Sequence, residues 1–365
     1  MTLYVPILKW KAGEISAYKN LNPIISNSVT PLFEVPPPEY DYMQKKDKKN
    51  IDEHLETFGD RYKENCGSRS CFIDTSLIPE EMRMRDGRLP MEFVFDEIRQ
   101  RTLSAIPVAR LDQSDSLTKL IKTINTKDKR GLCLRLTLDQ ILNSGLESKI
   151  ETFLSNLKAN YSDIDLLIDL KRPTNFEPIE SLAKMLQMLS GKIPKLNSWR
   201  SFIISACSFP ESLSEFKDPV SEIKRSEWSL YLKLVTLLSE KEIRPVFSDY
   251  AIRTPEYKRF DPTKMSAPKN KIIYTIDDGW LIYKGSRSNR DGGSSEYHDM
   301  SKLLMDSKYF MGKEYSWGDK FIADCAKKEV VKGKTKPGSL TKWLEAGTNH
   351  HATKVVNDLS KIFAL

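Results

Sequence analysis

The 365-residue sequence lacks the features of a disulfide-rich protein, a metal-binding module or a membrane protein. Its five cysteines are odd in number and scattered, and none forms a CxxC or lies at zinc-ligand spacing with one of the four histidines. No stretch approaches the roughly 18 uncharged apolar residues of a membrane span. The apolar N-terminus contains Lys9 and Lys11 without a charged segment before it, unlike a secretion signal. We expect reduced thiols and a cytoplasmic protein that makes no membrane contact.

A large excess of charge of one sign is also missing. The chain has 57 Lys+Arg and 50 Asp+Glu residues, so its net charge is +7, far below that of a histone-like protein. With 39% hydrophobic and 29% charged residues, the composition excludes a disordered, collagen-like or coiled-coil chain. The excess is concentrated at one end, because 17 basic and 12 acidic residues lie from Lys269 onward. This basic region is compatible with phosphate or nucleic-acid contact, or with a solvated surface.

Short apolar runs rich in β-branched and aromatic residues recur along the first 250 residues. Their apolarity is continuous rather than alternating, which is typical of parallel strands buried on both faces. We therefore predict eight strands, at Leu3–Lys9, Val29–Val35, Cys71–Thr75, Ala105–Leu111, Gly131–Thr137, Ile164–Lys171, Ser201–Cys207 and Arg244–Asp249.

Amphipathic segments separate several of these strands. Apolar residues at helical spacing predict helices over 114–124, 138–157, 179–189 and 228–238. Strand and helix alternating eight times over about 250 residues indicate an α/β fold, a (β/α)8 TIM-like barrel. The alternative is an open doubly wound sheet, but such sheets usually have a glycine-rich first turn, and residues 9–14 contain one glycine.

A different pattern follows the loop-like residues 251–268. Two β runs at 271–276 and 280–284 flank Asp277-Asp278-Gly279, which is a strong hairpin signal. Helices are expected through 300–305, from Ser316–Asp319, and after Asn349–His351. We therefore predict a barrel domain at residues 1–255 and, packed on it, a basic α+β subdomain at residues 256–365.

Recognisable sequence signatures stand near both ends of the chain. They are Tyr4–Lys11, Pro31–Val35, Trp280–Gly285, Gly318–Asp319, Trp343 and Gly347–His351. Together with the regular spacing between them, they resemble the phage and bacterial "beta protein" family over essentially the whole chain. The distribution of that family implies involvement in phage–host conflict, and the resemblance implies no set of catalytic residues.

Candidate site residues follow from the barrel itself, because functional side chains of such barrels lie at the C-terminal ends of the strands. Nearly every predicted strand here ends on a charged or polar group, and charges gathered at a barrel mouth need pairing or water. The acidic candidates for catalysis are Glu34, Asp74, Asp169 and Asp249, and the candidates for ligand binding are Lys9, Arg110, Arg135, Lys171 and Tyr250.

The mixed signs of these residues leave two interpretations open. In one, the carboxylates hold Mg²⁺ or act as general acid and base, while Arg110 and Arg135 bind a phosphate with their paired N–H groups. In the other, the charges form an ion-pair network that fills the mouth. No histidine lies at a strand end, but His350 is a further ligand-binding candidate if the C-terminal segment folds over the mouth. Otherwise it is a histidine at the start of a helix that contacts a backbone carbonyl.

Two hypotheses about function remain. In the first, the protein is a component of a phage-related or antiphage defence system, and its mouth recognises a nucleotide, a nucleic acid or a protein partner encoded by a neighbouring gene. In the second, it is a metal-dependent hydrolase or phosphodiesterase acting on nucleotides or nucleic acid, which would need the carboxylates as well as the arginines.

Overall fold

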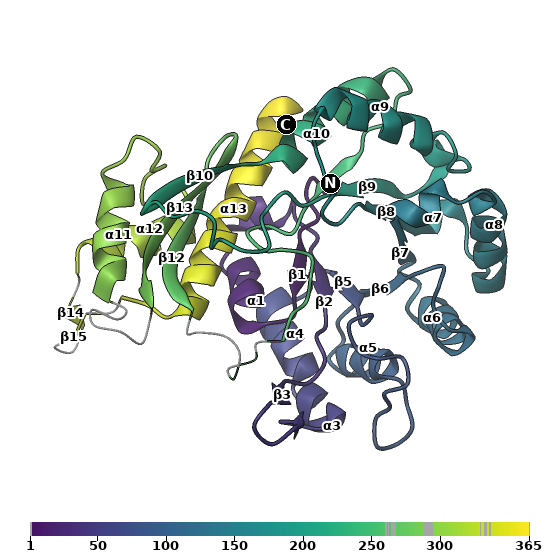
Figure 1. Cartoon of the computed structure of the whole chain (residues 1–365). Helices are drawn as coiled ribbons and strands as arrows, with labels where there is room; N and C mark the ends of the chain where they lie inside the picture. Colours follow the sequence, from purple (N-terminus) through teal and green to yellow (C-terminus); the bar gives the residue numbers. More distant parts are fainter. Residues whose placement is uncertain are drawn as a thin grey trace.

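The computed structural model describes residues 2–259, 261, 263, 268–287, 295–328, 330–331, 334–335 and 337–364. Its centre is a sheet of eight parallel strands, one for each predicted apolar run (Figure 1). In sheet order they are β1 (Ile7–Lys9), β2 (Leu32–Glu34), β5 (Phe72–Asp74), β6 (Ile106–Ala109), β7 (Leu132–Thr137), β8 (Ile164–Asp169), β9 (Ser201–Ser205) and β11 (Val246–Ser248).

The sheet curls until its two outermost strands meet. The backbone N–H of Val5 donates to Phe247 O over 2.9 Å, and that of Ile7 donates to Asp249 O over 2.8 Å. A parallel bridge also joins Tyr4 to Phe247. The sheet is therefore a nearly closed barrel, and the prediction of a mixed α/β fold built on eight parallel strands is confirmed.

Side chains along the strands alternate between two hydrophobic clusters, as the two-residue period of a strand requires. One cluster packs against the surrounding helices and takes Leu8, Phe33, Ile73 and Leu134. The other fills the barrel and contains Val5, Ile7, Leu32, Phe72, Val108, Cys133, Leu167 and Ile203. Because both faces of each strand are covered, the strands need the continuous apolarity seen in the sequence.

Helices cover the outer side of the barrel (Figure 1). They are α1 (Ala12–Lys19), α2 (Pro23–Ser26), α3 (Ile51–Leu55), α4 (Phe58–Cys66), α5 (Pro90–Gln100), α6 (Asp115–Asp128), α7 (Leu138–Leu142), α8 (Leu146–Leu157), α9 (Ile179–Ser190) and α10 (Ser226–Ser239). The segment predicted as one helix over 138–157 is two helices, because residues 143–145 leave helical geometry and Gly145 has a φ of 93°.

A second, antiparallel sheet lies beside the barrel. Its order is β10 (Val220–Lys224), β13 (Gly279–Arg287) and β12 (Lys269–Thr275). β12 and β13 form the predicted hairpin, whereas β10 is not among the predicted strands. Because β10 comes from the segment before residue 255, the expected domain boundary does not separate the two sheets. Among the described residues there are also two short hairpins: β3 (Tyr40–Asp41) with β4 (Lys46–Asp47), and β14 (Val330–Val331) with β15 (Lys334–Thr335).

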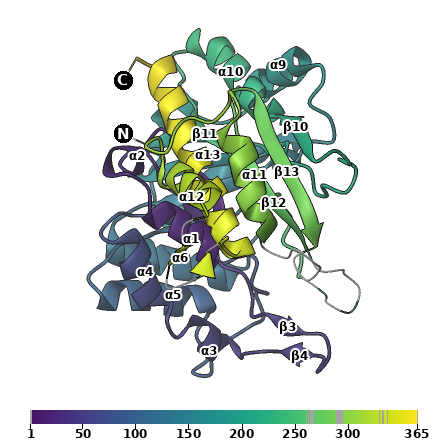
Figure 2. The same ribbon diagram turned by 90° about the vertical axis from the view of Figure 1, so that its left-hand side faces the viewer.

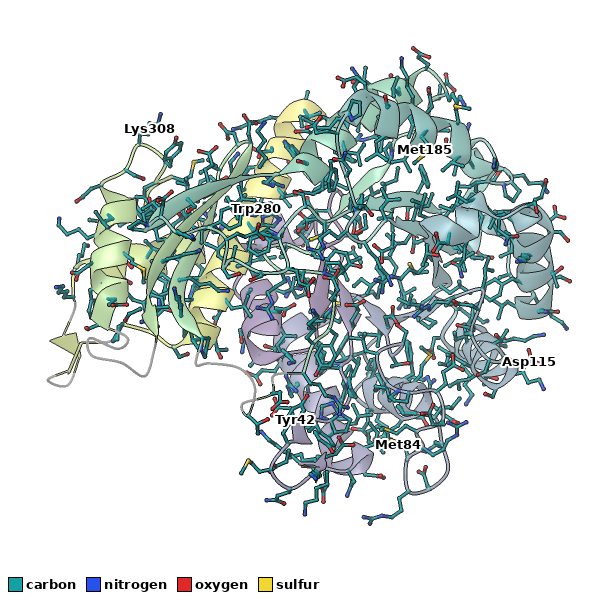
Figure 3. All side chains as sticks on the ribbon, in the orientation of Figure 1. Tyr42, Met84, Asp115, Met185, Trp280 and Lys308 are labelled. Atoms are coloured by element: carbon teal, nitrogen blue, oxygen red, sulfur yellow. The ribbon has the colours of Figure 1, made fainter. Side chains whose placement is uncertain are left out.

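The two faces of the second sheet have different neighbours. Ile273, Trp280 and Ile282 on one face pack with Tyr250 and Phe209, which follow barrel strands, and Figure 3 shows Trp280 between the sheet and the barrel. On the other face, alternate residues of β12 and β13 pack against α11 (Glu296–Met305) and α12 (Trp317–Ala326). The sheet therefore covers part of the barrel mouth.

The last helix, α13 (Leu340–Ile362), joins the two sheets into one structure. It begins nine residues before Asn349, so His350 and His351 lie in its middle rather than at its start. Ala352, Val355, Val356 and Leu359 belong to the cluster between the barrel strands and their helices, and α13 runs beside α1 (Figures 1 and 2). The chain end therefore occupies the position of the eighth barrel helix.

Candidate functional site

Polar side chains at the C-terminal ends of the strands converge inside the barrel mouth. Apart from Tyr250, which follows Ser248 by two positions, each lies two residues beyond an interior apolar residue, as Glu34 does after Leu32, so the strand period points it inward. We call this group the charge cage; its members are Lys9, Glu34, Asp74, Arg135, Asp169 and Tyr250. The exposed fractions of the five charged side chains lie between 0% and 9%.

Arg135 occupies the centre of the charge cage. Its Nη1 donates to Glu34 Oε1 over 2.8 Å and to Asp74 Oδ2 over 2.7 Å. Its Nε and Nη2 donate to Asp169 Oδ2 over 3.1 and 2.6 Å. Nη2 also contacts the Tyr250 hydroxyl over 2.8 Å, and that hydroxyl donates to Asp169 Oδ2 over 2.7 Å. One guanidinium group therefore binds three carboxylates from three strands.

The remaining carboxylate oxygens of the charge cage also have donors. The Lys9 ammonium contacts Glu34 Oε2. The backbone N–H of Ser76 donates to Asp74 Oδ1, and that of Lys171 donates to Asp169 Oδ1, each over 2.8 Å. Lys171 thus contributes its backbone, while its side chain is exposed. All six carboxylate oxygens are engaged by groups of the protein itself.

Two opposing effects set the pKa values in the charge cage: burial disfavours each charged form, and the contacts described above stabilise it. Burial raises the pKa of Asp74, but the charge of Arg135 and the Ser76 hydrogen bond outweigh it and leave that pKa below its ordinary value. Burial likewise opposes the charge on Arg135, yet its pKa lies well above the ordinary value because of Tyr250 and the carboxylates around it. Both groups are therefore charged at neutral pH, and the cage is a network of ions.

This geometry bears on the Mg²⁺ and phosphate interpretations. A divalent cation needs several free carboxylate oxygens, and those of the charge cage are bound to Arg135, Lys9 and backbone N–H groups. Within the described residues, no group of three or more His, Cys, Asp or Glu side chains is placed to hold a metal ion. The residues do not fit Mg²⁺, and the buried guanidinium of Arg135 has no edge left for a phosphate.

Arg110 lies outside the charge cage and lines a hollow of about 160 Å³ that begins at Asp74. The hollow is formed by the loops after β5 and β6 and by the first residues of α5 and α6. The Arg110 side chain is 33% exposed, and its ion pair within the described residues is a contact of 3.6 Å to Asp112. Arg110 is therefore a cation at the mouth whose charge is only weakly countered.

Asp249 does not join the charge cage. It follows Ser248 and precedes Tyr250, so its side chain points to the other side of the barrel wall. Tyr4 Oη donates to its Oδ1 over 2.5 Å, and its Oδ2 lies 2.9 Å from His351 Nε2. Burial raises the pKa of Asp249, but His351 and the other donors outweigh it and lower that pKa below its ordinary value. Asp249 thus connects the barrel to α13.

His350 contacts the second sheet and α12 instead of the charge cage. Its Nδ1 lies 2.8 Å from Asp319 Oδ2, and its Nε2 lies 2.8 Å from the carbonyl oxygen of Thr275. Both partners are acceptors, because Asp319 also accepts the hydroxyls of Tyr274 and Ser316. His350 is therefore fully buried, with each ring nitrogen at hydrogen-bonding distance of an acceptor, and it connects α13 to α12 and to the second sheet.

The structure brings six of the sequence-predicted residues into one group and distributes the other four. The six are Lys9, Glu34, Asp74, Arg135, Asp169 and Tyr250. Arg110 lines the neighbouring hollow, Lys171 is exposed, and Asp249 and His350 hold α13 in place. Asp319 is a residue whose buried contact with His350 the sequence does not indicate, since its spacing from Ser316 predicts a helix cap, a contact that is also present.

Fold and site together define an α/β barrel protein with an ion-pair cage in its mouth and a small hollow beside it. A family model described as Beta protein matches residues 4–357, nearly the whole chain. The chain therefore belongs to the Beta protein family, as the resemblance of its two ends indicates. No curated protein matches the sequence. Within the described ranges, no helix is both long and apolar enough to cross a membrane.

Proposed function

We propose that this protein is a recognition component of a phage-related or antiphage system, and that it binds a phosphate group of a nucleotide or nucleic acid in the hollow beside Arg110. The observation that carries the proposal is the position of Arg110, which lines a hollow at the mouth with its guanidinium outside the charge cage. Paired N–H groups of arginine match the oxygens of a phosphate.

The start of α6 supports an anion at the same place. Ser114 is the N-cap of α6 and lines the hollow, and its backbone N–H donates to Glu80 Oε2 over 3.2 Å. Helix N-termini attract anions, and Glu80 already supplies one from the loop after β5. A phosphate bound to Arg110 would replace the exposed Glu80 carboxylate at this helix start.

The size of the hollow limits the ligand. A volume of about 160 Å³ is below the roughly 300–1,000 Å³ of sites that enclose a whole small molecule. The hollow therefore accepts a phosphate and the atoms next to it, while the rest of a nucleotide or oligonucleotide extends over the mouth. This favours recognition of a terminal phosphate.

The test is calorimetric binding of a dinucleotide with and without a 5′-phosphate. Arg110→Ala is expected to weaken binding of the phosphorylated form at least tenfold and to leave the unphosphorylated form unchanged. Glu80→Gln is expected to strengthen binding, because it removes the competing anion. Arg172→Ala is the matched control, since Arg172 is 32% exposed, follows β8 on the same face, and pairs with Glu211. Equal affinities of Arg110→Ala and the unmodified protein would contradict the proposal.

A second measurement addresses the biological role. Bacteria expressing the protein are challenged with phages, and plaque formation is counted for the unmodified chain and for Arg110→Ala. Loss of an effect on plaque formation in Arg110→Ala, but not in Arg172→Ala, is the expected result. Metal-dependent cleavage of the dinucleotide would argue against pure recognition and in favour of hydrolysis.

A further inference from the structure

A larger hollow lies at the opposite end of the barrel, where the strands begin. Its volume is about 570 Å³, within the roughly 300–1,000 Å³ range of sites that enclose a small molecule. Both chain termini lie on this side, away from the β3–β4 hairpin at the mouth (Figure 2). The hollow is therefore separate from the Arg110 site and independent of the function proposed for it.

Four basic residues line this second hollow: Lys129, Arg130, Arg200 and Arg244. They come from the segments that lead into β7, β9 and β11. The C-terminal end of a helix carries partial negative charge and attracts cations. This accounts for basic residues in or next to a last helical turn, such as Lys129 after α6. It does not explain Arg200 and Arg244, each of which stands within two residues of the start of a strand.

Arg200 is fixed in place by two sets of contacts. Its Nε and Nη2 donate to the carboxylate of Asp165 over 3.1 and 2.5 Å, and its Nη1 donates to the carbonyl oxygen of Arg130 over 2.7 Å. The close contact between Arg200 and the backbone of Arg130 requires glycine at position 131. A Cβ there would lie 1.9 Å from Asp163 O and 2.6 Å from Arg200 Nη1. The segment carrying Lys129 and Arg130 is thus held against the rim.

Asp165 neutralises Arg200, and the other three cations remain. Within the described part of the chain, Lys129, Arg130 and Arg244 form no ion pair. Arg244 is positioned by stacking, since its guanidinium carbon lies 3.5 Å from the centroid of the Phe363 ring. A stacked arginine keeps its charge and its N–H groups for a ligand.

The floor of the second hollow is apolar. It consists of residues at the N-terminal end of the barrel interior, including Val5, Phe72 and Ile106. The hydroxyls of Thr2 and Thr30, 2.8 Å apart, add polar groups at the rim. A ligand that matches this lining has a compact apolar body and carries its negative charge at one end.

We infer that the N-terminal end of the barrel is a second ligand site, which takes a nucleoside monophosphate or a compound of the same size and chemistry. Its phosphate contacts Arg130, Arg244 and Lys129, and its ring lies on the apolar floor. The site is unlike the mouth hollow in that it encloses the ring as well as the phosphate.

The inference is tested by calorimetry with the four ribonucleoside 5′-monophosphates and with the corresponding nucleosides. All proteins carry Arg110→Ala, so the mouth site is silent. Two variants are compared with this protein: the single substitution Arg130→Ala, and the same substitution combined with Arg244→Gln. Each is expected to weaken monophosphate binding at least tenfold and to reduce the dependence of binding on salt. Nucleoside binding should stay the same, because it uses only the floor.

Lys127→Ala is the matched control, since Lys127 is an exposed cation in the last turn of α6 that does not line the hollow. The Arg130 side chain makes no hydrogen bond within the described residues, so its removal should leave the fold intact, and thermal unfolding of the variant checks this. The inference is overturned if none of the four monophosphates binds at millimolar concentration, or if Arg130→Ala binds them as tightly as Lys127→Ala does.

Discussion

Replacing Arg135 with methionine tests whether the charge cage is an ion network that the fold depends on. Arg135 donates four hydrogen bonds to the three carboxylates and contacts Tyr250. Methionine has a similar length but removes all of them, which leaves Lys9 as the remaining cation of the cage. Removing one partner of a buried ion pair costs about 3–5 kcal/mol. We expect a loss of that size, which is a large fraction of the roughly 5–15 kcal/mol that stabilises most proteins.

The loss of stability in Arg135→Met should depend on pH. In the unmodified protein the pKa of Asp74 is lowered, so Asp74 contributes stability above its ordinary pKa, and this is lost as the pH falls through the lowered value. In Arg135→Met, burial is no longer opposed by the guanidinium, so the pKa of Asp74 is raised instead. The variant should therefore gain stability, relative to the unmodified protein, as the pH falls from 8 toward about 4.

Urea unfolding followed by tryptophan fluorescence at a series of pH values measures both effects. Arg172→Met is the control, because its contacts to Glu211 and Glu256 are partly exposed and such pairs contribute about 0–1 kcal/mol. Adding Asp74→Asn and Asp169→Asn to Arg135→Met should restore part of the stability, since uncharged partners no longer need a counter-ion. A loss below about 1 kcal/mol, or an unchanged pH slope, would show that the cage is not the ion network described.

Three further predictions concern other parts of the fold. Burial raises the pKa of Glu227 from 4.5 to about 7. The stability that protonated Glu227 contributes is therefore fully present below pH 4.5 and is lost as the pH rises through 7. Glu227→Gln should abolish about 3 kcal/mol of pH dependence in that window, measured by urea unfolding. Gly131→Ala should destabilise by at least about 1 kcal/mol more than Gly145→Ala in thermal melts: both glycines have positive φ, but a Cβ meets a backbone oxygen 1.9 Å away only at the first. Asp319→Asn should cost about 1–3 kcal/mol in urea unfolding, because the amide accepts at one oxygen only, whereas both carboxylate oxygens of Asp319 have buried partners in Tyr274, Ser316 and His350.

The strands of the barrel could be predicted from the sequence, because burial on both faces imposes a pattern that needs no knowledge of the partners. Every residue of Ile164–Asp169 is buried, and this segment stands out in the sequence as a mainly apolar run. β10 offers no such pattern, since its residues alternate between exposed and half-buried and it is a strand because it pairs with β13. The start of α13 was placed at Asn349 for a related reason. That residue resembles a helix cap, but its side chain contacts Gly318 N and Ala17 O across the fold.

The sequence predicts which residues lie at the strand ends, but it does not predict how their side chains are arranged in space. Asp249 and Tyr250 are neighbours, and only the phase of the strand decides that the tyrosine enters the barrel. Arg110 and Arg135 are the same residue type at corresponding strand ends. Three carboxylates from other strands converge on Arg135, whereas the ion pair of Arg110 among the described residues is a contact to Asp112, two positions along the chain. This difference arises from the tertiary arrangement of the strands, so the sequence alone does not show that Arg110, unlike Arg135, keeps N–H groups for a phosphate.

The position of α13 explains why the barrel and the second sheet form one structure. Val355, Val356 and Leu359 of this helix are buried with the barrel helices, while Trp343 near its start belongs to the cluster of the second sheet. A barrel ending at residue 255 would expose the apolar surface that these residues cover, and would leave Asp249 without His351. The second sheet also covers part of the mouth. Displacing this sheet would therefore disturb two places at once: Tyr250 of the charge cage, which packs against Ile273 and Trp280, and His350 of α13, which lies 2.8 Å from Thr275 O.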